Sequence, residues 1–404
     1  MPGHSQRGPG VWRAAGGLAA VAALGLAACW SLRLAYADHL GRGVTREAVE
    51  RAVRLAPGDA RNHQRLAALD AGRKVSALRA ALALNPRDSA SWIELGLEAE
   101  RRGELGEAER CLLEAAHVDR TLDPRWSLAN YYFRQDDYPR FWHWAAEAAA
   151  MMYGDAAPLF RLCWRVTQDP EVMLARGLGD RPELLRQYLY FLLGAASPKS
   201  AEPVAQRLLE RGDGAAAPVL LAYCDRWLEA GQAEPAARVW NALAARRWIP
   251  ATALAPDRGL GVTNGDFSAP PVGSGFDWRV PEVPGAATTR TRSPAGLKIT
   301  FSGRQPEECE LLSQPLWLAP GKTYRLSYGF RTADIEAGSG LEWRVAGAKS
   351  GSLTSADWTE QSLEFAAPDS SGPARLVLAY RRAPGTTRIE GTLWLQRVAL
   401  GLAR

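Results

Sequence analysis

The sequence predicts a multidomain protein with an α-helical and an all-β part: an N-terminal transmembrane helix, an α-solenoid and a C-terminal β-sandwich. Three observations predict this fold class. Residues 14–32 contain no charged side chain, residues 37–249 carry paired stretches with helical periodicity, and residues 263–404 carry short stretches with alternating apolar residues. A length of 404 residues gives room for two or three domains.

The charge-free run follows a polar tail that contains Arg7 and Arg13. Its length matches the roughly 17–25 residues of a membrane-spanning helix. We therefore predict a cytoplasmic tail at 1–13 and an uncleaved signal anchor at 14–36. Because a large region after a first apolar segment is usually translocated, we expect a single span in the bacterial inner membrane, with most of the chain in the periplasm.

A cleaved secretory signal is the alternative to the anchor. The stretch Leu26-Ala27-Ala28-Cys29 resembles the lipobox of bacterial lipoproteins, and this resemblance implies lipidation of Cys29. However, Trp30 is bulky for the position after such a cysteine, and the helical pattern continues through Ser31–Leu40. These two features favour the anchor.

Residues 92–115 contain the best-formed helical pair. Gly96 and Ala108 are small where the two helices approach each other, and Gly103 stands at the turn, where a left-handed backbone favours glycine. The apolar and small positions are Trp92, Leu95, Gly96, Ala99, Gly103, Leu105, Ala108, Leu112 and Ala115. This pattern resembles the tetratricopeptide repeat (TPR). The resemblance implies neighbouring hairpins, because one hairpin cannot bury both of its faces.

Related helical stretches precede and follow this pair. Ser76–Pro86 ends in the proline typical of a second repeat helix, and looser pairs continue to Arg247. We therefore predict a TPR-like helical repeat domain at 37–249. Solenoids of this kind offer extended concave surfaces, so the expected partner is a protein bound in the groove.

The pattern changes at residue 250. Residues 250–262 contain Pro and Gly without helical periodicity, which predicts a linker. From residue 263 onward apolar residues alternate with polar ones, for example in Tyr324–Phe330 and Leu341–Val345. Regular short strands separated by turns predict an all-β sandwich at 263–404.

The β-region resembles the carbohydrate-binding jelly-roll modules of many bacterial glycosidases and envelope proteins. The resemblance is carried by Asn264-Gly265-Asp266-Phe267, by Phe276 and Trp278, and by the turn Pro320-Gly321-Lys322 before Tyr324. It implies a jelly-roll fold and a glycan as candidate ligand. The last strand of such modules often carries a calcium-binding acidic residue. Because Trp394–Val398 contains none, we expect no structural calcium.

Strand phase singles out two candidate carbohydrate-binding residues. Trp317 lies between two leucines, as does Trp394, so each tryptophan points away from the aliphatic face of its strand. If the leucines face the core, both indoles face outward and are available to stack on a sugar ring. Packing against the helices or the linker is the alternative. Trp343 and Trp358 are expected in the core.

The motifs, residue spacing and net charge argue against several classes of function. The sequence contains no nucleophile elbow, phosphate-binding glycine loop or histidine–carboxylate grouping, so we expect no enzyme and no cofactor. The five histidines and five cysteines lack metal-ligand spacing, so no metal site is expected. A net charge of +5 without a basic run argues against nucleic-acid binding.

These observations predict a non-enzymatic, membrane-anchored scaffold of the bacterial cell envelope, with TPR-mediated protein binding and a link to polysaccharide production or export. The alternative is a lectin-like envelope protein that binds a glycan through its sandwich and uses the solenoid as a spacer.

Overall fold

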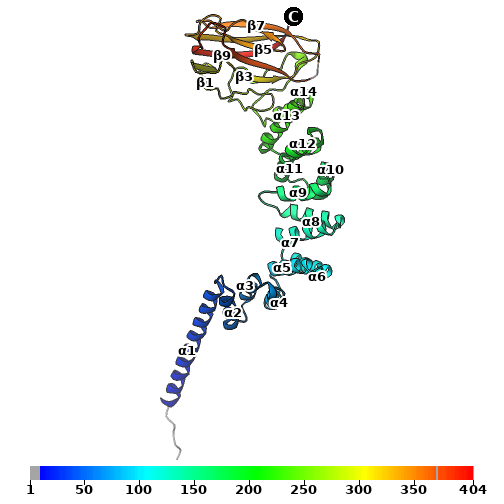
Figure 1. Cartoon of the computed structure of the whole chain (residues 1–404), viewed down its shortest axis with the longest axis vertical. Coiled ribbons are helices and arrows are strands. Elements are labelled where there is room, and N and C mark those ends of the chain that lie inside the picture. The colour runs from blue at the N-terminus through cyan, green and yellow to red at the C-terminus, as the bar shows by residue number, and fades with distance from the viewer. Residues whose placement is uncertain (1–9, 370–371, 404) are drawn as a thin grey trace, which may run out of the picture. The chain divides into compact units, whose positions relative to one another are not determined.

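A computed structural model describes the backbone of residues 10–369 and 372–403 (Figure 1). The chain forms two compact units, residues 1–153 and 154–404. The predicted cytoplasmic tail falls largely outside the described residues. The predicted fold class is confirmed: a long apolar helix, a TPR-like helical region and a two-sheet antiparallel β-sandwich.

Helix α1 spans Gly10–Gly41. Within residues 17–41, the most apolar stretch of 18 residues has a mean hydropathy of 1.8, and none of this stretch is buried. In the described part of the chain this is the one helix long and apolar enough to cross a membrane. A signal sequence near an N-terminus has the same properties.

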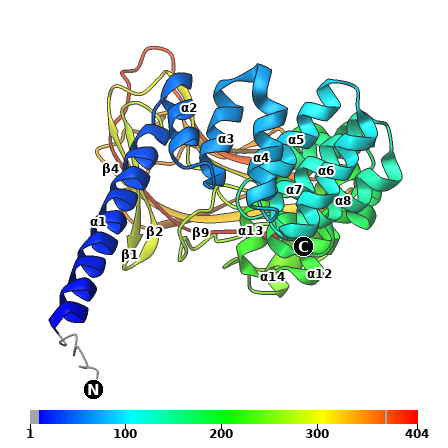
Figure 2. The ribbon, with the colours of Figure 1, turned by 90° about the horizontal axis from the view of Figure 1, so that it is seen from below.

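Seven further α-helices belong to the described part of the first unit. They are α2 (Arg46–Leu55), α3 (Ala60–Leu69), α4 (Lys74–Leu84), α5 (Ser89–Arg101), α6 (Leu105–Val118), α7 (Leu122–Arg134) and α8 (Tyr138–Met151). Helices α3 to α8 pair as successive hairpins, which Figure 2 shows side by side. Asp59, Asp88 and Asp137 accept hydrogen bonds from backbone N–H groups in the first turns of α3, α5 and α8. These caps fix where the helices begin.

Glycines shape the hairpin α5–α6 as the sequence predicts. A Cβ atom at Gly96 would lie 2.9 Å from Cγ of Leu112 and 3.2 Å from the carbonyl oxygen of Ala108, so the two helices approach closely at this point. Gly103 has a φ of 78°, a left-handed conformation that favours glycine. Both predictions are confirmed.

The second unit begins with three more hairpins. Its helices are α9 (Ala157–Val166), α10 (Pro170–Met173), α11 (Pro182–Ala195), α12 (Pro198–Arg211), α13 (Ala217–Glu229) and α14 (Ala233–Ala245). A π-helical turn over Leu174–Leu178 continues α10, so this hairpin is irregular. Pro182 and Pro198 begin their helices, where a missing N–H group costs no hydrogen bond.

The expected linker, residues 250–262, is packed against its neighbours. The Trp240 indole N–H donates to the Thr252 carbonyl over 3.1 Å, and Leu254 and Pro256 are buried. The Tyr324 hydroxyl donates to the Pro256 carbonyl over 3.0 Å. The segment therefore connects the last hairpin to the β-region through fixed contacts.

In the part of the chain that the structure describes, nine strands form the two antiparallel sheets of the sandwich. They are β1 (Ala286–Arg292), β2 (Ala295–Ser302), β3 (Glu308–Leu316), β4 (Thr323–Ala333), β5 (Leu341–Val345), β6 (Ala348–Lys349), β7 (Thr359–Ala366), β8 (Ala374–Arg381) and β9 (Glu390–Leu402). The five-stranded sheet has the order β1-β2-β9-β4-β7 and the four-stranded sheet β3-β8-β5-β6. Alternate residues face the core between the sheets, as Tyr324, Leu326, Tyr328 and Phe330 do on β4.

An ion pair joins α13 to the sandwich within the second unit. An Arg279 guanidinium nitrogen lies 2.6 Å from Oδ1 of Asp225, which also accepts the Gly275 N–H over 2.9 Å. Beside it, the ring centroids of Trp240 and Phe276 are 6.0 Å apart. Burial raises the pKa of the Asp225 carboxyl, and the positive charge of Arg279 opposes this shift.

Candidate functional site

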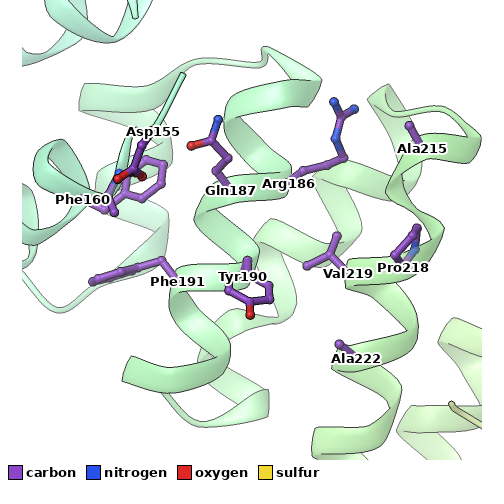
Figure 3. Close-up of a pocket in the computed structure, with 11 residues that line it drawn as sticks. Asp155, Phe160, Arg186, Gln187, Tyr190, Phe191, Ala215, Pro218, Val219 and Ala222 are labelled. Carbon is purple, nitrogen blue, oxygen red and sulfur yellow. Dashed lines mark hydrogen bonds between the residues drawn. The ribbon is translucent and has the colours of Figure 1, made fainter. Parts of the chain in front are cut away.

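A groove of about 670 Å³ runs across the helical part of the second unit (Figure 3). Its walls come mainly from the first helices of three successive hairpins, α9, α11 and α13, and α11 contacts both of the others. First helices of stacked hairpins form a continuous concave surface in repeat proteins. The lining residues are Asp155, Ala157, Phe160, Arg186, Gln187, Tyr190, Phe191, Ala215, Pro218, Val219 and Ala222.

Aromatic rings make up one side of the groove. The ring of Phe191 lies 5.8 Å from that of Phe160 and 5.7 Å from that of Trp164, measured between centroids. Phe160 is buried and Phe191 is half-buried, so packing holds both rings in place. The groove therefore offers a fixed apolar surface to an incoming side chain.

Tyr190 is the most exposed of the large apolar groups that line the groove. Its side chain is 72% exposed, whereas Tyr188 and Leu189 of the same helix are buried. Figure 3 shows Tyr190 on α11 between the aromatic side and the α13 side of the groove. Tyrosines in such positions are frequent hot spots of protein interfaces.

The polar groups around the groove are mostly engaged with the backbone. The Gln187 side chain accepts the Ala156 N–H and donates to the Gly154 carbonyl, both over 2.9 Å. Asp155 accepts the Ala157 N–H over 2.9 Å. The Arg186 guanidinium is more loosely held, with Glu183 and Asp213 oxygens both 3.9 Å away. The groove thus presents apolar surface with one cation near its edge.

The sequence analysis did not single out Tyr190. Helical periodicity could have identified it. The buried face of α11 consists of Leu185, Tyr188, Leu189 and Leu192. Tyr190 falls outside that face. What the sequence does not show is that α9 and α13 complete the groove around this residue.

The two predicted carbohydrate-binding residues lie on different sheets. Trp394 is part of β9 in the five-stranded sheet, whereas Trp317 directly follows β3 in the four-stranded sheet. Both are half-buried, and the leucines beside them are buried. The structure therefore does not combine them into one aromatic platform.

The expectation for Trp358 was wrong, whereas that for Trp343 is confirmed. Trp343 is fully buried in the sandwich core, but the Trp358 side chain is 42% exposed. Trp358 and Trp394 line a common depression with Arg331, which lies between them on β4. The partner of Trp394 on the sandwich surface is thus Trp358 and not Trp317.

The cysteines of the helical hairpins are packing residues. Cys111, Cys163 and Cys224 are all completely buried, and burial raises the pKa of the Cys163 thiol to about 12. Cys29, the candidate lipidation site, is exposed within α1, which continues beyond it to Gly41. Within the described residues, no three His, Cys, Asp or Glu side chains are grouped so that they could hold a metal ion.

No protein-family model matches the chain, and no curated protein matches it. Several solved structures are similar. A CBM4 structure is 16% identical, covers 35% of this chain and 98% of its own, and gives a TM-score of 0.26.

Two TPR structures match the helical region. YrrB, described as a TPR protein with an unusual peptide-binding site, is 14% identical, covers 50% of this chain and 94% of its own, and gives a TM-score of 0.25. PilF of Pseudomonas aeruginosa is 17% identical, covers 54% of this chain and 90% of its own, and gives a TM-score of 0.25. At these identities the likeness concerns the fold alone.

Proposed function

We propose that the protein is a non-enzymatic, membrane-anchored interaction scaffold of the bacterial envelope. Its helical groove binds a segment of another protein that offers apolar side chains. The proposed location is the inner membrane, with a single span and the helical and β-regions in the periplasm. A link to polysaccharide production or export accounts for a sandwich of the carbohydrate-binding type on the same chain.

The observation that carries this proposal is the exposed Tyr190 in an apolar groove. Leaving a large aromatic ring in water costs free energy, which a partner's side chains recover on binding. The groove is lined by helices and contains no pair of groups arranged for acid–base or nucleophilic chemistry. Its chemistry suits recognition of a polypeptide.

Site-specific photo-crosslinking tests the proposal. The full chain carries p-benzoylphenylalanine in place of Tyr190 and is irradiated in intact cells. We expect a discrete crosslinked protein, and we expect the same partner to bind purified Tyr190→Ala at least about tenfold more weakly than wild type. The same photoprobe at Lys199, an exposed position on α12 outside the groove, serves as the control. Equal crosslinks from both positions, or unchanged affinity of Tyr190→Ala, contradict the proposal.

Glycan binding by the sandwich is the second candidate function. It is favoured by the position of Trp394, which points away from the core on the five-stranded sheet beside a depression of about 250 Å³. In this case the solenoid acts as a spacer. Titration of the full chain with envelope polysaccharides, compared with Trp394→Ala and Trp317→Ala, tests it. Because Trp394 lines this depression together with Trp358 and Trp317 does not, we expect a larger loss for Trp394→Ala.

A further inference from the structure

Four side chains form a row across the outer face of the five-stranded sheet. The strand register places Lys298 of β2 beside Trp394 of β9, and Trp394 beside Arg331 of β4. Phe330 pairs with Thr359, so Trp358 stands beside Arg331 at the start of β7. We call Lys298, Trp394, Arg331 and Trp358 the cation–aromatic row. Strands are about 4.8 Å apart, so the row spans about 14 Å.

The cations of the row lie over the indole rings. The Arg331 guanidinium carbon is 4.3 Å from the ring centroid of Trp394 and 5.7 Å from that of Trp358. Nζ of Lys298 is 5.8 Å from the ring centroid of Trp394. These distances are typical of cation–π contacts, which fix the positions of the charges on the sheet.

Neither cation of the row forms an ion pair with a carboxylate in the described part of the chain, and Nε of Arg331 is buried without a hydrogen-bond partner. Two other arginines of this sheet are paired with carboxylates. Arg325 of β4 lies 2.6 Å from Glu364, and Arg397 lies 2.5 Å from Glu360. The positive charge of Arg331 is thus not neutralised by a carboxylate of the described residues, and an anionic ligand would neutralise it.

The depression beside the row has a volume of about 250 Å³. One of its lining residues is Gly296, where a Cβ atom would lie 2.5 Å from the Leu395 carbonyl oxygen. The volume is below the roughly 300–1,000 Å³ of pockets that enclose a small molecule. A ligand would therefore place one substituent in the depression and extend along the row.

We propose that the cation–aromatic row binds an acidic polysaccharide whose sugar units carry carboxylates, such as uronates. This inference rests on the glycan-binding function proposed above and names its ligand class. Trp358, 42% exposed at the edge of the sheet, offers an indole face to the apolar face of a sugar ring, whereas Arg331 and Lys298 lie over the ring of Trp394. The planar guanidinium of Arg331 matches a carboxylate with two parallel hydrogen bonds, and Lys298 supplies a second charge. A row that alternates charge and aromatic face suits a polymer that repeats both features.

Binding of two polysaccharides by the full chain in neutral detergent tests the inference. Polygalacturonate is the acidic probe and xylan the neutral one. We expect wild type to bind polygalacturonate at least about tenfold more tightly than xylan. Arg331→Gln should reduce polygalacturonate affinity by about tenfold or more and leave xylan affinity unchanged. Arg331→Lys should be intermediate, because it keeps the charge and loses the planar fork. Trp394→Ala should weaken both interactions.

Arg325→Gln is the matched control. Arg325 lies on the same strand and the same outward face as Arg331, but its charge is paired with Glu364. We expect its polygalacturonate affinity to equal that of wild type. An equal loss in Arg325→Gln and Arg331→Gln shows attraction by bulk charge and overturns the inference.

The remaining outcomes separate the ligand class from glycan binding itself. Equal affinities for xylan and polygalacturonate, both lost in Trp394→Ala, overturn the acidic ligand and leave glycan binding standing. No binding of either polysaccharide overturns both. A lower melting temperature of Arg331→Gln with unchanged affinity assigns the row a structural role and also overturns the inference.

Discussion

Trp343 and Trp358 show how the position of a residue along a strand decides whether its side chain is buried or exposed. On β7 the inward residues are Thr359, Gln361, Leu363 and Phe365, so Trp358 belongs with the outward set. Counting back from Phe365 in steps of two gives this assignment, which the expectation of a core position overlooked. Trp343 keeps step with the buried residues Leu341 and Val345 of β5.

We therefore expect substitutions of the two tryptophans to destabilise the sandwich to different extents. Trp343→Ala should destabilise the sandwich by about 3–5 kcal/mol, because it opens a large cavity in a packed core. Trp358→Ala should cost less than about 1 kcal/mol, since it removes a half-exposed ring and one cation–π contact. Hydrogen-exchange mass spectrometry of peptides from β4 and β8 measures local stability within the full chain. Similar loss of protection in both variants would contradict this assignment.

At the scale of the element, the helical hairpins depend on a few turn residues. Gly103 and Gly231 have φ values of 78° and 73° at the turns of α5–α6 and α13–α14. At the turn of α7–α8, Asp136 adopts a similar left-handed conformation with a φ of 55°. The three turns therefore share a left-handed residue, which is glycine in two of them and aspartate in the third. Glycine, and less readily aspartate, supplies this conformation at low cost.

Close approach of α5 and α6 predicts the effect of a single methyl group. Gly96→Ala should destabilise the hairpin by about 1–3 kcal/mol, because the new Cβ overlaps the rigid centre of the Leu112 side chain. Gly106→Ala adds the same methyl group to α6, where nothing lies within 4 Å. It should be neutral or stabilise by up to about 1 kcal/mol through helix propensity. Thermal unfolding of the full chain, with exchange protection read on α5 and α6, distinguishes the variants. Equal destabilisation by both would exclude a steric cause.

At the scale of the whole molecule, the division into compact units differs from the division by composition. The sequence changes from helical to alternating periodicity at residue 250, but residues 154–404 form one unit. Asp225 and Trp240 of the last hairpin contact Arg279 and Phe276, which precede the first strand. The sandwich therefore closes the open end that the final hairpin would otherwise expose.

The N-terminal helix predicts how the whole chain is retained at the membrane. If α1 is an uncleaved anchor, the mature protein keeps Met1, stays in the membrane fraction after alkaline washing, and is digested by protease added to spheroplasts. Cys29→Ser should leave membrane retention unchanged. Intact-mass measurement of the purified chain checks the N-terminus. A mature chain that begins at an acylated Cys29, and is lost from the membrane in Cys29→Ser, would establish the lipoprotein alternative.

The sequence predicted the helical and β-regions in their order, because periodicity records which face of each helix or strand is buried, but it did not predict strand β1. It also determined the close approach at Gly96, the left-handed turn at Gly103 and the outward direction of Trp394, since each follows from local spacing. Which residues meet depends on tertiary contacts that local spacing does not contain. The groove around Tyr190 needs three hairpins, and the row through Trp394 needs the pairing of β2, β9, β4 and β7, strands distant in sequence. Local spacing defines a face, but strand order and helix stacking decide which faces become neighbours.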